Sequence, residues 1–149
     1  MLRSKPNPKD PNGYDRNSYR SSDEVNNIRW ENLKPGSDEY QMFQYYAGLS
    51  AIRTSFDIFT NHKASFKAYE HNDNLGYNII ITDSNGGKAI VIINPEGRSI
   101  NFTLDGTYHL VCDGVTAGTT SLGTKSGSIT VPAYSAYIFV NDQVLKNPK

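Results

Sequence analysis

The feature that most constrains this chain is a change of pattern near residue 60. The stretch 17–56 begins as a polar, unpatterned loop and ends as an amphipathic helix, and strand-like segments follow it. This order is typical of the end of one domain joined to the start of another, so we divide the chain into 1–60 and 61–149. A chain of 149 residues has room for one domain and an extension. A barrel of eight strands and eight helices needs roughly 250 residues and does not fit.

Composition narrows the classes of function. Fifteen basic and fifteen acidic residues balance, so no net charge attracts the chain to nucleic acid or to an acidic membrane surface. No apolar run approaches the roughly 20 residues that cross a bilayer, and no apolar signal segment stands at the N-terminus. If the chain is a fragment, the compartment of its parent stays open. Cys112, the only cysteine, excludes an internal disulfide and a cysteine-based zinc site, and we expect it to be buried.

The first 36 residues have the chemistry of turns. They hold four of the seven prolines, together with several Asn, Ser and Gly residues. Such a segment buries too little apolar surface to offset its own ordering entropy. We therefore predict that residues 1–20 are irregular and held only by contacts, with a short helical turn near Asp23–Trp30.

The clearest predicted helix begins after Ser37 and ends near Thr54. The Ser37 hydroxyl can cap free N–H groups of the first turn, and the two acidic residues that follow it complement the helix dipole. Gly48 weakens the helix, so we expect it to let another element approach closely. The apolar stripe recurs at spacings of three and four and consists of Met42, Tyr45, Tyr46, Leu49, Ile52 and Phe56.

The remainder of the chain predicts a mostly β fold, an antiparallel β-sandwich. The run 89–93 is continuously apolar and indicates a central strand covered on both faces. Turn residues separate the segments, with Asp105-Gly106 predicted as one such break. Residues 113–127 are rich in Gly, Thr and Ser and predict one long surface loop. The seven candidate strands are Ser65–Glu70, Gly76–Asp83, Lys88–Asn94, Ser99–Leu104, Tyr108–Cys112, Ser128–Val131 and Ala136–Asn141.

No residue pattern in the chain predicts catalysis, a metal or a cofactor. The histidines (His62, His71 and His109) lack metal-ligand spacing. Serine, histidine and aspartate are all present, but no G-x-S-x-G turn surrounds a serine. Four aspartates fall where turns are predicted, which is where Asp is favoured on its own account: Asp83, Asp105, Asp113 and Asp142.

The aromatic residues of the β-segment allow two interpretations. Exposed flat rings would bind sugar, whereas buried rings would build the core of the sandwich. The only Trp, Trp30, lies outside the β-segment, and the pattern favours core packing. The residues concerned are Tyr69, Tyr77, Tyr108, Tyr134, Tyr137 and Phe139.

Three local patterns stand out in the sequence. The first is Leu2-Arg3-Ser4-Lys5 with Asn17-Ser18-Tyr19, Asp23-Glu24-Val25-Asn26, Ile28 and Trp30; the second is Tyr45-Tyr46-Ala47-Gly48-Leu49 with Ile52-Arg53 and Phe56; the third is Ile129-Thr130-Val131-Pro132 with Ala136–Val140. Together they resemble the C-terminal end of type I pullulanases, the starch-debranching enzymes of glycoside hydrolase family 13 in the α-amylase superfamily. The second pattern is shared by many amylase relatives, and the third is weak alone.

The resemblance implies that residues 1–60 are the loop after the eighth barrel strand and the final barrel helix, and that 61–149 are an amylase-type C-terminal β-domain. It implies a parent that hydrolyses α-1,6 branch bonds with retention, which needs two carboxyl groups about 5–5.5 Å apart. In the family these groups lie on earlier barrel strands, which have no counterpart here. We therefore expect the chain alone to be an inactive fragment with a structural role, and the parent to be bacterial, either secreted, at the cell surface or cytoplasmic.

The same resemblance identifies candidate contacts for the complete parent. Arg3, Asn17, Tyr19 and Asp23 would lie on the ligand-binding face of the barrel and could touch glucan there. The alternative is that they only shape the loop. The expected partner is the catalytic barrel, and self-association through the helix face (Met42, Tyr45, Tyr46, Leu49 and Ile52) is a further expectation. The alternative function is an independent α-glucan-binding β-sandwich module.

Overall fold

The computed structural model describes residues 29–61, 63–70 and 77–148, without the side chains of 66 and 68–70. The predictions for residues 1–28 lie outside this range, as do His62 and His71. Two compact units, Met1–Phe43 and Gln44–Lys149, divide the chain. The elements are η2 (Trp30–Asn32), α2 (Asp38–Ser55), η3 (Asp57–Phe59), β1 (Ser65–Glu70), β2 (Tyr77–Thr82), β3 (Lys88–Asn94), β4 (Ile100–Asp113), β5 (Thr124–Val131), β6 (Ser135–Val140) and α3 (Asp142–Lys146).

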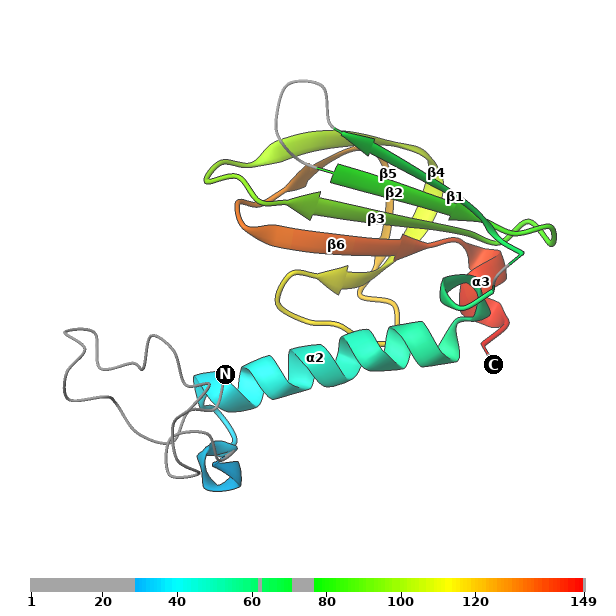
Figure 1. The fold of residues 1–149 in the computed structure, drawn as a ribbon. Helices are drawn as coiled ribbons and strands as arrows, with labels where there is room; N and C mark the ends of the chain where they lie inside the picture. The colour runs from blue at the N-terminus through cyan, green and yellow to red at the C-terminus, as the bar shows by residue number, and fades with distance from the viewer. Residues whose placement is uncertain (1–28, 62, 71–76, 149) are drawn as a thin grey trace, which may run out of the picture. The chain divides into compact units, whose positions relative to one another are not determined.

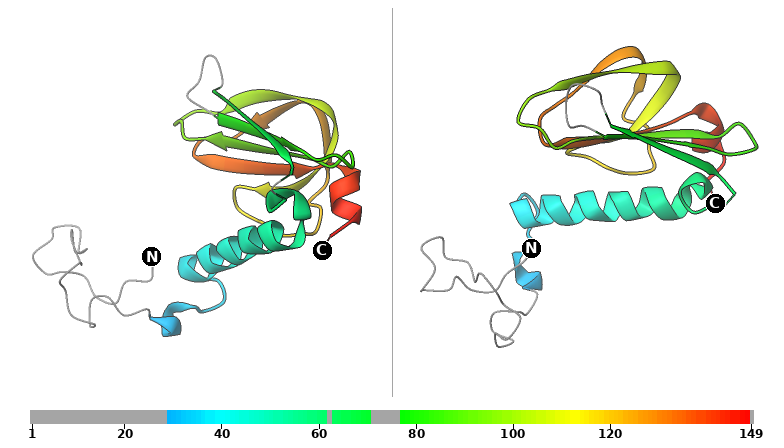
Figure 2. Two further views of the ribbon diagram at one scale, coloured as in Figure 1. Left: turned by 45° about the vertical axis from the view of Figure 1, so that its right-hand side comes forward. Right: turned by 45° about the horizontal axis from the view of Figure 1, so that its top comes forward.

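The strands form one six-stranded antiparallel sheet in the order β1-β2-β3-β6-β4-β5. The last part of β4 pairs with β6, while its first part pairs with β5, so the β4–β5 hairpin continues the sheet and curls over it (Figure 1). On the other face, the part of α2 from Gln44 onward packs against the sheet through Tyr45, Leu49 and Ile52 (Figure 2). The result is the predicted mostly β, sandwich-like fold preceded by an amphipathic helix.

Each face of the sheet covers its own hydrophobic core. Between the sheet and the curled hairpin lie side chains of β3 to β6, among them Ile90, Leu104 and Phe139. On the opposite face, Ile52 and Phe56 pack with residues of the sheet and of α3. The central strand β3 therefore has apolar side chains toward both cores, as its continuous apolar run predicted, except that Ile93 at its end is 38% exposed.

Helix α2 has the cap and the packing that its sequence predicts. The Tyr40 N–H donates to Ser37 Oγ (3.1 Å), and the helix ends one residue beyond Thr54. A Cβ at Gly48 would lie 1.9 Å from the carbonyl oxygen of Ala117, so the expected close approach is made by the loop after β4. The stripe is divided: Ile52 is buried, whereas Met42 and Tyr46 are exposed. Ile52 is thus not part of any exposed helix face, which corrects the sequence prediction.

Strand prediction failed where β4 is irregular. The predicted strands 99–104 and 108–112 are one strand, and Asp105-Gly106 is not a turn between them. Leu104 pairs with Gly127 and Tyr108 with Lys125, so a bulge on β4 absorbs the extra residues without ending the strand. The predicted loop 113–127 is also shorter, because Thr124–Gly127 already pair with β4 as part of β5.

Candidate functional site

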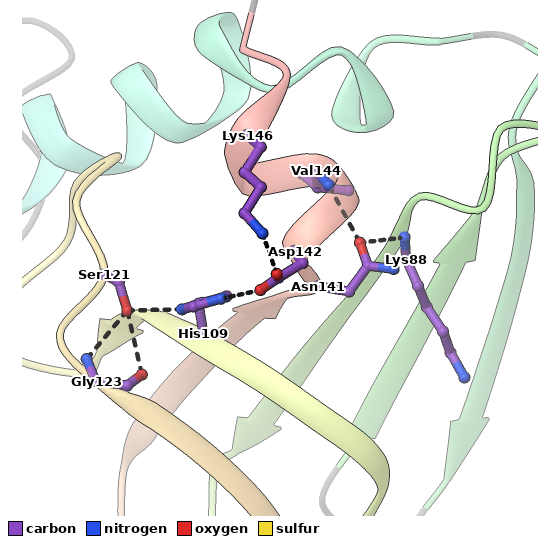
Figure 3. Close-up of polar contacts among 8 residues, drawn as sticks. All are labelled: Lys88, His109, Ser121, Gly123, Asn141, Asp142, Val144 and Lys146. Atoms are coloured by element: carbon purple, nitrogen blue, oxygen red, sulfur yellow. Dashed lines mark hydrogen bonds and ion pairs between the residues drawn. The ribbon is translucent and has the colours of Figure 1, made fainter.

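A polar cluster lies at the end of the sheet where β3 begins and β6 ends (Figure 3). Its centre is Asn141, the N-cap of α3. Asn141 Oδ1 accepts hydrogen bonds from the N–H groups of Val144 (3.2 Å) and Lys88 (3.1 Å), and its Nδ2 donates to Gly86 O (2.8 Å). One side chain therefore joins the β2–β3 turn, the start of β3 and α3.

His109 on β4 adds a second link to this cluster. Its Nε2 lies 2.5 Å from Asp142 Oδ1, and its Nδ1 lies 3.1 Å from Ser121 Oγ (Figure 3). Lys146 forms an ion pair with the other oxygen of Asp142. Lys146 first, and then His109, hold the pKa of the Asp142 carboxyl below its usual range. Sequence reasoning missed this cluster because Ser121 and Asp142 lie 12 and 33 residues from His109 in the sequence.

The order serine, histidine, aspartate is that of a hydrolase triad, but the surroundings favour a structural role. Ser121 Oγ accepts from Gly123 N (3.2 Å) and lies 3.3 Å from Gly123 O, so it is part of a local turn. A catalytic serine instead stands beside donors for the oxyanion, on a turn that presents its hydroxyl to a substrate. We interpret the three residues as a brace between β4, the loop before β5, and α3.

A further polar cluster, made of the side chains of Lys88, Asp105 and Tyr108, explains the bulge in β4. The Tyr108 hydroxyl donates to Asp105 Oδ1 (2.6 Å), Lys88 forms an ion pair with the same carboxylate, and the Lys88 ammonium lies 5.9 Å from the centre of the Tyr108 ring. The hydrogen bond from Lys88 and then the one from Tyr108 lower the pKa of Asp105. Burial, followed by the bond to Asp105, raises the pKa of Tyr108. These contacts hold the bulged backbone in place.

Two of the other aspartates have the turn role that the sequence predicts. Asp83 Oδ1 accepts from the N–H groups of Asn85 and Gly87, at 2.8 Å each. Asp113 Oδ1 accepts from Val115 (3.0 Å) and Thr116 (2.7 Å). One oxygen of each carboxylate, Oδ1, is thus occupied by local backbone N–H groups. Within the described part of the chain, no group of His, Cys, Asp or Glu could hold a metal ion.

Cys112 is buried, as predicted. Its Sγ donates to Ala136 O (3.4 Å), so the Tyr45 hydroxyl, 3.3 Å from the sulfur, donates to it. Burial first, and then the hydrogen bond to Cys112, raise the pKa of Tyr45. The pair links α2 to β4 and gives no sign of a reactive thiol.

The opposite end of β3 carries a different site. Asn94, which is 1% exposed, donates from Nδ2 to the carbonyl oxygens of Arg98 (2.9 Å), Val131 (3.2 Å) and Pro132 (2.7 Å). Its Oδ1 accepts from Glu96 N (3.1 Å). This side chain ties the β3–β4 turn to the β5–β6 turn. Tyr134, on the second turn, is 78% exposed and has a φ of 53°.

The aromatic residues divide between the two interpretations that the sequence allowed. Tyr108 and Phe139 are buried and Tyr137 packs against them, so core packing is confirmed for these three. Tyr77 (44%) and Tyr134 (78%) are exposed instead. The side chain of Tyr69 lies outside the described residues, as do Arg3, Asn17, Tyr19 and Asp23. No helix of the described chain is both long enough and apolar enough to cross a membrane.

Comparison with known proteins finds the fold of this chain in parts of several larger solved structures. No protein-family model and no curated protein sequence matches the chain. Among solved structures, it is similar to the pullulanase of Bacillus acidopullulyticus (TM-score 0.67, 23% identity, 87% of this chain, 16% of that chain). It is also similar to the catalytic module of the pneumococcal glycogen-degrading virulence factor SpuA (0.70, 22%, 85% and 22%) and to the Group B Streptococcus pullulanase SAP (0.66, 20%, 83% and 20%). These likenesses show the fold, and the chain spans less than a quarter of each structure.

Proposed function

We propose that this chain is the non-catalytic C-terminal part of a type I pullulanase of glycoside hydrolase family 13, where it packs on the catalytic barrel. The observation that carries the proposal is the similarity of nearly the whole chain to a small part of several pullulanases. The sequence patterns at residues 2–30, 45–56 and 129–140 support it independently, because they resemble the C-terminal end of type I pullulanases.

The polar contacts agree with a supporting role. A retaining glycosidase needs two carboxyl groups about 5–5.5 Å apart, one as the nucleophile and one as the acid. The carboxylates of Asp105 and Asp142 are each paired with a lysine and hold the bulge and α3 in place. The chemistry of the parent would then belong to its earlier barrel strands.

Helix α2 has the surface that a connecting element needs. Ile52, and Phe56 just beyond its last residue, anchor the C-terminal half of the helix in the β-domain, whereas Tyr46 is 63% exposed. In the parent, the exposed side of this helix would contact the neighbouring helices of the barrel. Aromatic side chains that are exposed on the isolated chain would be buried in this contact with the barrel.

The experiment begins with the DNA upstream of codon 1, which should continue in frame into a catalytic barrel. The barrel and this chain are then produced as two polypeptides, and the release of reducing ends from pullulan is measured. We expect no activity from this chain alone and more activity from the mixture than from the barrel alone. An upstream frame without a barrel, or hydrolysis by this chain alone, would contradict the proposal.

A matched pair of variants tests the helix contact. Tyr46→Ser should weaken the activation of the barrel, because it removes an exposed ring from α2. Tyr77→Ser removes a comparably exposed ring from β2 and should leave activation unchanged. Equal effects of the two variants would count against packing through the helix.

An independent α-glucan-binding module is the second candidate function. The exposure of Tyr134 favours it, because a ring that is 78% in solvent is available to a ligand. The two functions are compatible, since a supporting domain can also hold substrate.

A further inference from the structure

Tyr134 combines backbone strain with an exposed ring. Its φ of 53° lies in the left-handed region, which is unfavourable for residues with a Cβ and is usually occupied by Gly or Asn. Its side chain is 78% exposed, so core packing does not explain the choice of a tyrosine here. Such outliers persist only when surrounding structure holds them, and they gather at sites of function.

The turn that carries Tyr134 is held on two sides. The Tyr134 N–H donates to Glu96 O (3.1 Å), and the Ser135 hydroxyl donates to Pro132 O (2.7 Å). The buried Asn94 amide joins both turns through the four hydrogen bonds described above. The ring therefore projects from a preorganised base, which lowers the entropy that a ligand loses on binding.

The hydroxyl end of the Tyr134 ring lies close to Gly97. A Cβ on this residue would lie 2.8 Å from the Tyr134 hydroxyl and 3.5 Å from the ring carbon that bears it. The hydroxyl end of the ring thus rests over the backbone of the β3–β4 turn, and an alanine at this position would push it aside. The rest of the ring remains in solvent.

We propose that Tyr134 and the two turns that hold it form a stacking platform for a glucose unit of an α-glucan chain. The choice of glucan rests on the proposed function. A tyrosine offers an apolar face to the C–H groups of a sugar ring and a polar tip to its hydroxyl groups.

The platform suits a polymer better than a single sugar. One ring contributes little affinity by itself, but a polymeric chain that is held elsewhere on the same enzyme raises the local concentration of glucose units. The site would hold a branch or a neighbouring chain of the substrate near the domain.

The test measures binding of maltoheptaose by calorimetry and retardation of the protein in gels that contain amylopectin. Tyr134→Phe should retain most of the binding, because it keeps the stacking face and loses only the polar tip. Tyr134→Asn accepts the left-handed backbone but lacks the ring, and we expect affinity about tenfold lower. Gly97→Ala should weaken binding by moving the ring. Thermal unfolding should show Tyr134→Asn at least as stable as wild type, which separates lost binding from lost folding.

Absence of binding by the wild-type chain, or equal binding by wild type and Tyr134→Asn, would overturn the platform. Cellohexaose bound as tightly as maltoheptaose would overturn its assignment to α-glucan. None of these results bears on the activation of the barrel by this chain. Conversely, a chain that binds glucan through Tyr134 but does not activate the barrel would contradict the supporting role and leave the platform in place.

Discussion

The two ends of strand β3 are both held by an asparagine, yet they leave very different surfaces. At the first end, Asn141 joins a turn, a strand and α3, and the nearby charged side chains pair with one another. At the second end, Asn94 likewise bonds to backbone groups, and Tyr134 extends into solvent. The comparison indicates that the neighbours of each asparagine decide the surface: the paired charges beside Asn141 build a brace, whereas the turn beside Asn94 presents an exposed tyrosine.

The two ends should differ most in the unfolding free energy that is lost when the asparagine at each end is replaced by alanine. Asn94→Ala leaves buried carbonyl and N–H groups without partners, and we expect a loss of about 3 kcal/mol in the free energy of unfolding, measured with urea. Asn101→Ala, an exposed asparagine bonded to Thr130, is the matched control and should stay within about 0.5 kcal/mol of wild type. A small effect of Asn94→Ala would show that the turns hold without it.

Asn141→Ala should cost less, about 1–2 kcal/mol, because it removes an N-cap in a part-buried place. Hydrogen exchange should show faster opening of α3 and of the β2–β3 turn, with the Asn94 end unchanged. Equal losses for the two asparagines would break the distinction between the ends.

At Tyr134, in contrast, substitution should stabilise the protein. Tyr134→Gly relieves the left-handed strain and loses little burial, so we expect a gain of about 1 kcal/mol in the free energy of unfolding. Tyr137→Gly, on a neighbouring extended strand, should be destabilising in the same assay. A loss of stability in Tyr134→Gly would mean that the ring packs more than its exposure indicates.

The two ends should also differ in acid. Asp105 and Asp142 have lowered pKa values in the folded chain, so their stabilisation is complete above their usual value of 3.8. It disappears as the pH falls through the lowered folded values. We expect Asp142→Asn to reduce the slope of stability against pH below about 4 and Asn94→Ala to leave the slope unchanged. Unfolding curves recorded between pH 2 and pH 7 measure this slope. Equal slopes in wild type and Asp142→Asn would contradict the stabilising role of the Asp142 carboxylate.

The smallest expected effect concerns association of the chain with itself. With Ile52 buried, the exposed part of the stripe is reduced to Met42 and Tyr46, so we propose only weak self-association through α2. Light scattering at increasing concentration should show it, and Tyr46→Ser should diminish it. A strict monomer at high concentration would contradict this contact.

Sequence reasoning succeeded where the decisive interactions are local. The cap at Ser37 and the bounds of β1 and β3 follow from hydrogen bonds and periodicity within a few residues. It failed at Asp105-Gly106, because the same dipeptide serves in a hairpin turn or in a bulge, and the partner strand decides between them. The domain boundary at 60/61 and the roles of Arg3, Asn17, Tyr19 and Asp23 stay predictions.

Sequence alone therefore determined that this chain has an amphipathic helix followed by an antiparallel β-domain, because apolar spacing and capping residues act over one or two turns of backbone. Only the tertiary structure decided which side chains meet. The contact of His109 with Asp142 and the exposure of Tyr134 depend on strand register and on a bulge in β4. A shift of one residue in register would turn each side chain to the other face of the sheet, and the register is fixed only when a strand pairs with its partner.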